Sequence, residues 1–243
     1  TKINGGHFGI DRRLGNNQVG VAISYSNGSA DFNRFAGKYK SDSVGLSLYG
    51  KKYLENNNYI LSRIGITNFD TEVNRSLLAQ DGSLQNGKIK HNDIMYSTYL
   101  ELGKDFKYIT PYAGFSLDIL DRKGFDENNV SWGITAKNKT YMQQNIILGL
   151  RSDKINENLK FTSHINQQIN IGNRDLSFKG KFNNSSTEHT FKGINQIKNT
   201  TWIGTGIEKS FSENFGVGIN LDIRFDEFKK ADSILSTNLY YRF

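Results

Sequence analysis

Strict alternation of apolar and polar residues over long segments is the feature that most limits how this chain can fold. The final twelve residues read DSILSTNLYYRF, and they end on an aromatic side chain. Every second residue back from the end lies on a mostly apolar face made by Phe243, Tyr241, Leu239, Thr237 and Leu235. A period of two is the signature of a β-strand whose faces meet different surroundings. Taken alone, this segment fits either the last strand of a soluble sheet or the closing strand of a membrane barrel.

The same alternation recurs along all 243 residues. Its clearest example is 215–225, where Val217, Ile219 and Leu221 alternate with Gly216, Gly218 and Asn220. Eleven segments carry the pattern, at about 7–14, 19–25, 44–48, 60–66, 94–102, 109–119, 142–150, 159–171, 203–211, 215–225 and 232–243. The sequence therefore predicts a single all-β domain over residues 1–243.

The connections between these segments alternate between two lengths. Short turn sequences stand near 15–17, 55–58, 105–107, 153–158 and 212–214, whereas long polar stretches cover 28–40, 70–92, 121–139 and 173–199. Bacterial outer-membrane barrels have short periplasmic turns and longer extracellular loops, and strands of about ten residues cross the bilayer. The pattern predicts a transmembrane antiparallel up-and-down β-barrel, apolar outside and wet inside.

Composition excludes several other classes of protein. The mean hydropathy is -0.57, and no run approaches the roughly 18 apolar residues of a transmembrane helix. Cysteine is absent, which excludes disulfides and thiolate sites. The net charge is +7, but no stretch of Lys and Arg is dense enough to indicate nucleic-acid binding.

Charged residues of both signs fall on the face opposite the apolar one. We expect the following to face the lumen: Arg63, Glu101, Asp118, Arg151, Lys160, Glu208, Asp222, Arg224 and Arg242. Burying such groups in a small soluble core costs several kcal/mol per ion unless they are paired. A water-filled interior keeps them solvated, and a solvated wall residue without a unique role is the simplest interpretation of each.

The strand count indicates that a strand is missing. Single-chain bacterial barrels have an even number of strands, and eleven is odd. If Phe243 ends in the periplasm, the segment 7–14 runs inward from the cell surface. We therefore expect an opening strand upstream of Thr1. The alternative is a missed strand in 173–199, where Leu176, Phe178 and Phe182 alternate, although one more crossing would upset the alternation of short and long connections.

Four stretches resemble the translocator (β) domain of the monomeric autotransporters, the type V secretion family. They are the terminal LYYRF, the strand opening Tyr108–Tyr112 (YITPY), Gly45–Tyr53 (GLSLYGKKY) and Gly204–Glu208 (GTGIE). The terminal motif is shared by most outer-membrane barrels, so it is specific for location. The GLSLYG and GTGIE stretches point more narrowly to the autotransporters, and the resemblance covers nearly the whole chain.

The resemblance implies a twelve-stranded barrel in the outer membrane of a Gram-negative bacterium. This chain would begin at the second strand, so that the first strand, the linker helix that plugs the lumen and the secreted passenger domain would lie upstream. The implied function is export and surface display of that passenger. The implied partners are the passenger and linker helix, the barrel assembly machinery, which would recognise Phe243, Tyr241, Leu239 and Leu235, and outer-membrane lipid. We expect a monomer without a cofactor.

Two other functions remain open from the sequence alone. A small-solute channel would use the mixed-charge lumen as a selectivity wall. An outer-membrane hydrolase would need a His with an acid or Ser at the extracellular rim, but His7, His91, His164 and His189 are widely spaced and no GxSxG turn is present. We therefore expect no catalytic residue and no metal site. The sequence upstream of Thr1 would separate an exporter from a channel.

Overall fold

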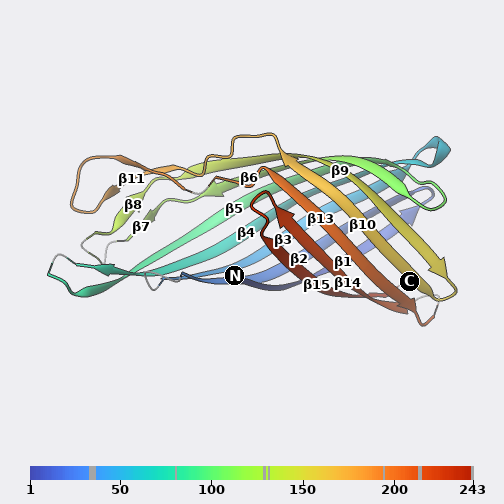
Figure 1. Ribbon diagram of the computed structural model, residues 1–243, viewed down its shortest axis with the longest axis horizontal. Helices are drawn as coiled ribbons and strands as arrows, with labels where there is room; N and C mark the ends of the chain where they lie inside the picture. Colours follow the sequence, from blue (N-terminus) through green and yellow to red (C-terminus); the bar gives the residue numbers. More distant parts are fainter. Residues whose placement is uncertain are drawn as a thin grey trace.

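Eleven long strands form one antiparallel sheet that curls into a barrel (Figure 1). The computed structural model describes residues 1–32, 37–79, 81–127, 130, 132–193, 195–212 and 215–241. Each strand pairs with its sequence neighbours, in the order β1 (Lys2–Leu14), β2 (Asn17–Phe32), β3 (Gly37–Tyr53), β4 (Asn58–Leu78), β5 (Leu84–Lys104), β6 (Thr110–Arg122), β9 (Lys139–Asn156), β10 (Leu159–Asn170), β13 (Asn199–Ser210), β14 (Phe215–Asp226) and β15 (Ala231–Tyr241). The predicted up-and-down β-barrel with about eleven strands is confirmed.

The outer face of the barrel is apolar. Its exposed side chains form a belt that includes Val21, Ile23, Val44, Leu46, Leu48, Ile64, Ile66, Leu100, Leu102, Leu148, Leu150, Ile165, Ile203, Ile207, Ile219 and Leu221. Polar residues alternate with them, and several of these are buried, such as Glu101 and Asn145. This polarity is the reverse of that of a water-soluble protein, because the continuous apolar surface faces outward.

A single short helix is present in the described residues, the 3-10 turn η1 (Glu55–Asn57). No helix among those residues is long and apolar enough to cross a membrane.

The β4–β5 hairpin is longer than the sequence predicted. Both strands run for 21 residues, and the ladder continues to Leu78 opposite Leu84. The prediction of a loop over 70–92 is therefore wrong. Polar side chains on the outer face pair across the strands instead, with Glu72 bound to Lys88 Nζ at 3.0 Å and to Lys90 Nζ at 3.3 Å. The expected loop 28–40 is also mostly strand, since β2 reaches Phe32 and β3 begins at Gly37.

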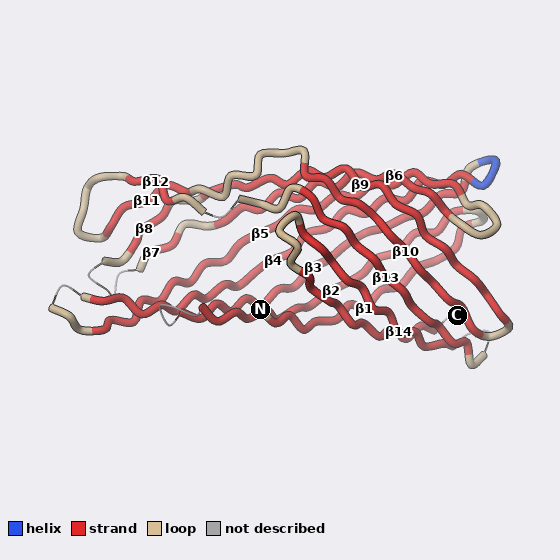
Figure 2. Tube along the Cα trace, viewed as in Figure 1, coloured by secondary structure: helices blue, strands red, loops and turns tan. Residues whose placement is uncertain are grey.

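The two remaining long connections form a separate four-stranded sheet, which lies at one end of the barrel, on the left in Figure 2. Its strand order is β12 (His189–Phe191), β11 (Phe178–Phe182), β8 (Ile134–Ala136) and β7 (Phe125–Asp126). The alternating residues Phe178 and Phe182 are thus in a strand, as the alternative interpretation of 173–199 suggested. That strand pairs with β8 and β12, so it adds no crossing to the barrel.

The barrel sheet ends in two edge strands, β1 and β15. All thirteen residues of β1 are exposed, and most of β15 is exposed as well. Within the described residues, β1 has a ladder only to β2 and β15 only to β14. Arg242 and Phe243 lie outside the described residues. The sheet therefore leaves a seam between its first and last strands.

A charge on the apolar belt should destabilise the barrel far more than the same charge on the inner face. Leu148 is 53% exposed on the outer face, and Gln168 lines the interior beside Ile147 at the same height. We expect Leu148→Arg to lower the free energy of unfolding in lipid vesicles by about 2–4 kcal/mol, the cost of Arg near the bilayer midplane. Urea titration of the vesicle-folded protein measures this.

The matched control is Gln168→Arg, which we expect to change the unfolding free energy by less than about 1 kcal/mol because the interior is polar. Equal losses for the two variants would contradict a lipid-facing belt.

Candidate functional site in the barrel interior

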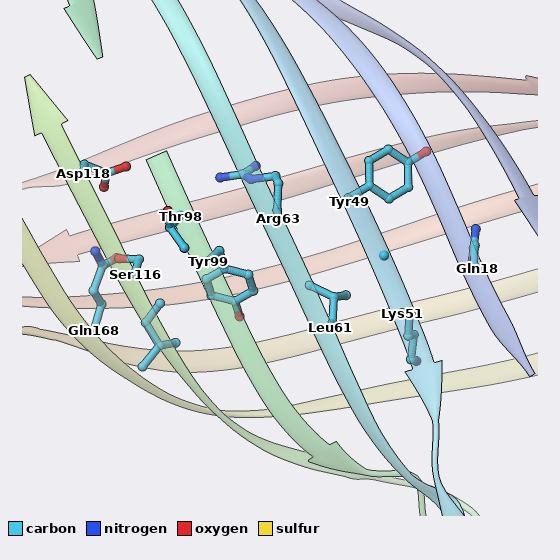
Figure 3. Close-up of a pocket in the computed structure, with 12 residues that line it drawn as sticks. Gln18, Tyr49, Lys51, Leu61, Arg63, Thr98, Tyr99, Ser116, Asp118 and Gln168 are labelled. Atoms are coloured by element: carbon cyan, nitrogen blue, oxygen red, sulfur yellow. The ribbon is translucent and has the colours of Figure 1, made fainter. Parts of the chain in front are cut away.

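An open cavity of about 650 Å³ lies along the inner wall of the barrel. Residues on the neighbouring strands β2 to β6, β9 and β10 line it, and Figure 3 shows most of their side chains. The lining residues include Gln18, Tyr49, Lys51, Leu61, Arg63, Thr98, Tyr99, Ser116, Asp118, Ile147 and Gln168. Hydroxyl, amide and charged groups share this lining with the apolar side chains of Leu61 and Ile147, so the wall can both hydrogen-bond and pack against a polypeptide.

Two of the charged residues singled out from the sequence, Arg63 and Asp118, line this cavity. Figure 3 shows them on β4 and β6, with β5 between them. They bring opposite charges to one stretch of the wall, next to Tyr99 and Ser116. Such a wall can hydrate or hydrogen-bond a chain of either charge.

Glu101 is the centre of a tightly packed cluster near the short-turn end of the barrel. Its side chain is 1% exposed and accepts hydrogen bonds from Tyr59 Oη at 2.7 Å and Tyr99 Oη at 2.5 Å. Arg151 donates a third from a guanidinium nitrogen at 2.9 Å and lies over the Tyr112 ring at 4.3 Å from its centroid. Three donors and an opposite charge compensate the buried carboxylate.

The tyrosines of this cluster were not identified from the sequence. Tyr59, Tyr99 and Tyr112 stand on the polar side of their alternating segments, and Tyr99 is two residues from Glu101. The alternation of apolar and polar residues therefore already indicated that these tyrosines face the barrel interior. This indication was missed because tyrosine fits either face of a membrane strand, and the sequence does not give the register that brings β4, β5 and β9 together.

Glycine makes room for these rings on the neighbouring strand. A Cβ at Gly103 would collide with the Tyr59 ring, and one at Gly149 would collide with that of Tyr112. The same relation joins Gly20 to Tyr49 and Gly216 to Tyr240. At these four positions the missing side chain leaves room for a tyrosine that lies across the adjacent strand.

The remaining charged residues form separate pairs on the wall. His164 Nε2 lies 3.4 Å from Asp222 across Gly204, and Arg224 pairs with Asp232 while lying 5.8 Å from the Trp202 ring centroid. Lys160 pairs with Asp153 at 3.0 Å, and Glu208 is half-buried beside Lys160 in the register of β10 and β13. Of the charged residues that the sequence predicted to face the lumen, Glu101 and Arg151 contact each other directly. Arg242 lies outside the described residues.

No metal centre is apparent in the part of the chain that the structure describes. Those residues contain no group of three or more His, Asp or Glu side chains placed to hold an ion.

The family model of the autotransporter beta-domain matches residues 1–222. This chain belongs to the autotransporter beta-domain family. No curated protein sequence gives a significant match. As an autotransporter beta-domain, the chain is an integral β-barrel of the outer membrane of Gram-negative bacteria and acts there as a translocator domain.

Solved structures with the same fold include other translocator domains. The translocator domain of the autotransporter NalP from Neisseria meningitidis is 14% identical over 98% of this chain and 78% of its own, with a TM-score of 0.81. The beta domain of the Bordetella autotransporter BrkA is 12% identical over 99% and 91%, with a TM-score of 0.65. The toluene transporter TbuX of Ralstonia pickettii also shares the fold, at 10% identity over 97% and 71% and a TM-score of 0.62.

Removing the Glu101 carboxylate should destabilise this beta-domain. We expect Glu101→Leu to lower the free energy of unfolding in vesicles by about 2–4 kcal/mol, because the Arg151 guanidinium and two tyrosine hydroxyls lose their acceptor. This expected loss is smaller than that for breaking a fully buried ion pair, since the Arg151 side chain is 32% exposed. Fluorescence of the two tryptophans, Trp132 and Trp202, reports the transition.

The control is Glu208→Leu, a half-buried carboxylate on the same face, for which we expect a loss below about 1 kcal/mol. Adding Arg151→Met to Glu101→Leu should recover part of the loss, because no unpaired charge then remains. If Glu101→Leu lowered the unfolding free energy no more than Glu208→Leu does, the Glu101 cluster would not contribute specifically to stability.

Proposed function

We propose that this beta-domain exports and displays on the cell surface a passenger domain that precedes it in the same polypeptide. The observation that carries the proposal is the family match over residues 1–222, joined to an interior cavity whose wall carries hydroxyl, amide and charged side chains. A polypeptide in transit exposes backbone amides and side chains of every kind. A wall of hydroxyl, amide and compensated charged groups can exchange hydrogen bonds with such a chain without holding it at one place.

The seam supports a further part of the proposal. In the part of the chain that the structure describes, strands β1 and β15 each have a ladder on one side only, whereas every hydrogen-bonding group in a bilayer needs a partner. We propose that a strand upstream of Thr1 completes the barrel between them, giving twelve strands, and that a linker helix continues from that strand through the lumen to the passenger. The single domain of residues 1–243 would then be the larger part of the barrel.

The lumen-wall residues have a defined place in this proposal. Arg63, Glu101, Asp118, Arg151, Glu208, Asp222, Arg224 and Arg242 would hydrate the passage and face the linker helix. Glu101 and Arg151 differ from the rest because they already neutralise each other at 2.9 Å. Their contribution would be to hold the wall in shape, whereas Arg63 and Asp118, which line the cavity, would contact the helix.

The proposed assembly signal is the apolar face of the last strand. Leu235 and Leu239 are 72% and 70% exposed on β15, and Tyr241 is exposed on the same face. Together with Phe243 they would present a strand edge with an apolar side to the barrel assembly machinery. After insertion the same side chains would lie against outer-membrane lipid.

A reporter fusion tests export. The full-length precursor carries a protease-sensitive reporter in place of the passenger, and protease added to intact cells measures surface display. We expect display from the intact barrel, and a loss of at least tenfold when Phe243 is deleted because assembly of the barrel fails.

Deletion of Phe228, an exposed aromatic of the β14–β15 loop, is the control and should leave display within twofold. Unchanged display after deletion of Phe243 would contradict the assembly signal. A folded barrel that conducts ions in planar bilayers but displays no reporter would favour a small-solute channel over an exporter.

A further inference from the structure

A buried carboxylate joins the long connections before β9 and β13 to the β4–β5 hairpin, on the face that continues the lumen wall. Glu127 follows β7, and its side chain is 0% exposed. Arg75, on the projecting part of β4, donates from Nε to Glu127 Oε1 at 2.9 Å and forms a second bond to Oε2. This is a bidentate pair between segments that lie 52 residues apart in the sequence.

Backbone groups complete the joint. The amide of Ile134 donates to Glu127 Oε2 at 3.2 Å, and Asn183 Nδ2 donates to the carbonyl oxygen of Glu127 at 2.7 Å. A Cβ at Gly87 would collide with the Glu127 carboxylate, and one at Gly133 with the Glu127 carbonyl oxygen. Glu127 therefore connects both strands of the β4–β5 hairpin to the connection before β9 and to the one before β13.

Aromatic packing supports the same joint. The ring of Phe125 lies 6.0 Å from that of His91 on β5 and 6.0 Å from that of Phe178 on β11. The Arg122 guanidinium lies over both phenyl rings, at 5.1 Å and 4.8 Å from their centroids. The small sheet thus turns its aromatic side to the hairpin.

The small sheet needs this anchor to keep its place. Its strands have two to five residues, at or below the short end of the usual range, so each contributes few ladder hydrogen bonds. A fully buried carboxylate is tolerated while its partners are present, and the loss of one partner leaves an uncompensated charge. Figure 1 shows the small sheet projecting beyond the barrel alongside the β4–β5 hairpin, at the end opposite the C-terminus.

We propose that Glu127 is a positioning residue for export. Its pairing with Arg75 holds the connections 123–138 and 171–198 against the hairpin as one rim, and this docked rim is the form through which the passenger leaves. When the joint is broken, both connections remain tethered at the mouth, where they obstruct the emerging chain. The proposal rests on the export function, but the joint itself can be tested without export.

The first test is proteolysis of the folded barrel. Trypsin sites at Lys179, Lys181 and Lys192 lie in the long connection before β13. We expect Glu127→Gln and Arg75→Gln to speed cleavage there at least tenfold, while the barrel keeps its heat-modifiable mobility on gels. The matched control is Glu188→Gln, which removes a carboxylate from the same connection. Glu188 is exposed and bound to Lys137 Nζ at 2.7 Å, a pair that holds its pKa below the ordinary value.

We expect the Glu188→Gln variant to be cleaved within twofold of the wild-type rate, because an exposed pair contributes little to docking. Cleavage of Glu127→Gln at the wild-type rate would overturn the joint, whatever the outcome for export.

The second test locks the rim. The chain has no native cysteine, so Gly87→Cys with Glu127→Cys gives a single possible disulfide within it. A Cβ built at Gly87 lies 3.4 Å from Glu127 Cγ, which brings the two Cβ atoms within reach of the roughly 3.5–4.5 Å that a disulfide needs. The reporter precursor of the preceding section measures export with this pair oxidised and reduced.

We expect the oxidised pair to display the reporter at the wild-type rate, and the reduced pair and Glu127→Gln to be at least fivefold slower. Export blocked by the disulfide would show that the docked rim is a closed form and would overturn the proposal. If the wild-type precursor displayed no reporter, the proposed function would fail, and the proteolysis result would still decide whether Glu127 holds the rim.

Discussion

Backbone hydrogen bonding between neighbouring strands is the interaction on which the whole structure depends. In lipid an unpaired amide or carbonyl group finds no water, so a spanning chain must satisfy these groups internally. The eleven-stranded ladder does so from β2 to β14, where each strand has two neighbours. Among the residues that the structure describes, β1 has a ladder only to β2 and β15 only to β14, and these two strands border the seam.

The polarity of the two faces follows from the same ladder. Because side chains alternate across a strand, an outer belt of Leu, Ile and Val requires that their sequence neighbours point inward. Those neighbours are small or polar, and several of the charged ones are paired, as Glu101 is with Arg151. Tyrosines that lie across glycines fill space which aliphatic side chains occupy in a soluble core. The interior is thus held together mainly by hydrogen bonds and rings.

Beyond the membrane the ladder continues with different side chains. On the projecting part of the β4–β5 hairpin, charged pairs such as Glu72 with Lys90 replace the aliphatic belt on the outer face. The lumen side of that hairpin carries Arg75 and His91, which receive the small sheet through Glu127 and Phe125. One continuous hairpin therefore contributes to the lipid-facing wall below and to the loop assembly above, which couples the arrangement of the loops to the barrel.

The sequence alone determined the class of fold and the inward or outward direction of most barrel residues, because a period of two is a local property. Residues 215–225 illustrate this, since alternation needs no partner strand to be visible. The length of the β4–β5 hairpin was not predicted, since polar residues alternating in a ladder look like a loop when the partner strand is unknown. The Glu101–Arg151 contact and the Glu127–Arg75 joint depend on register between segments about 50 residues apart. Only the tertiary structure could decide these contacts, because register is set by the combined pairing of many strands.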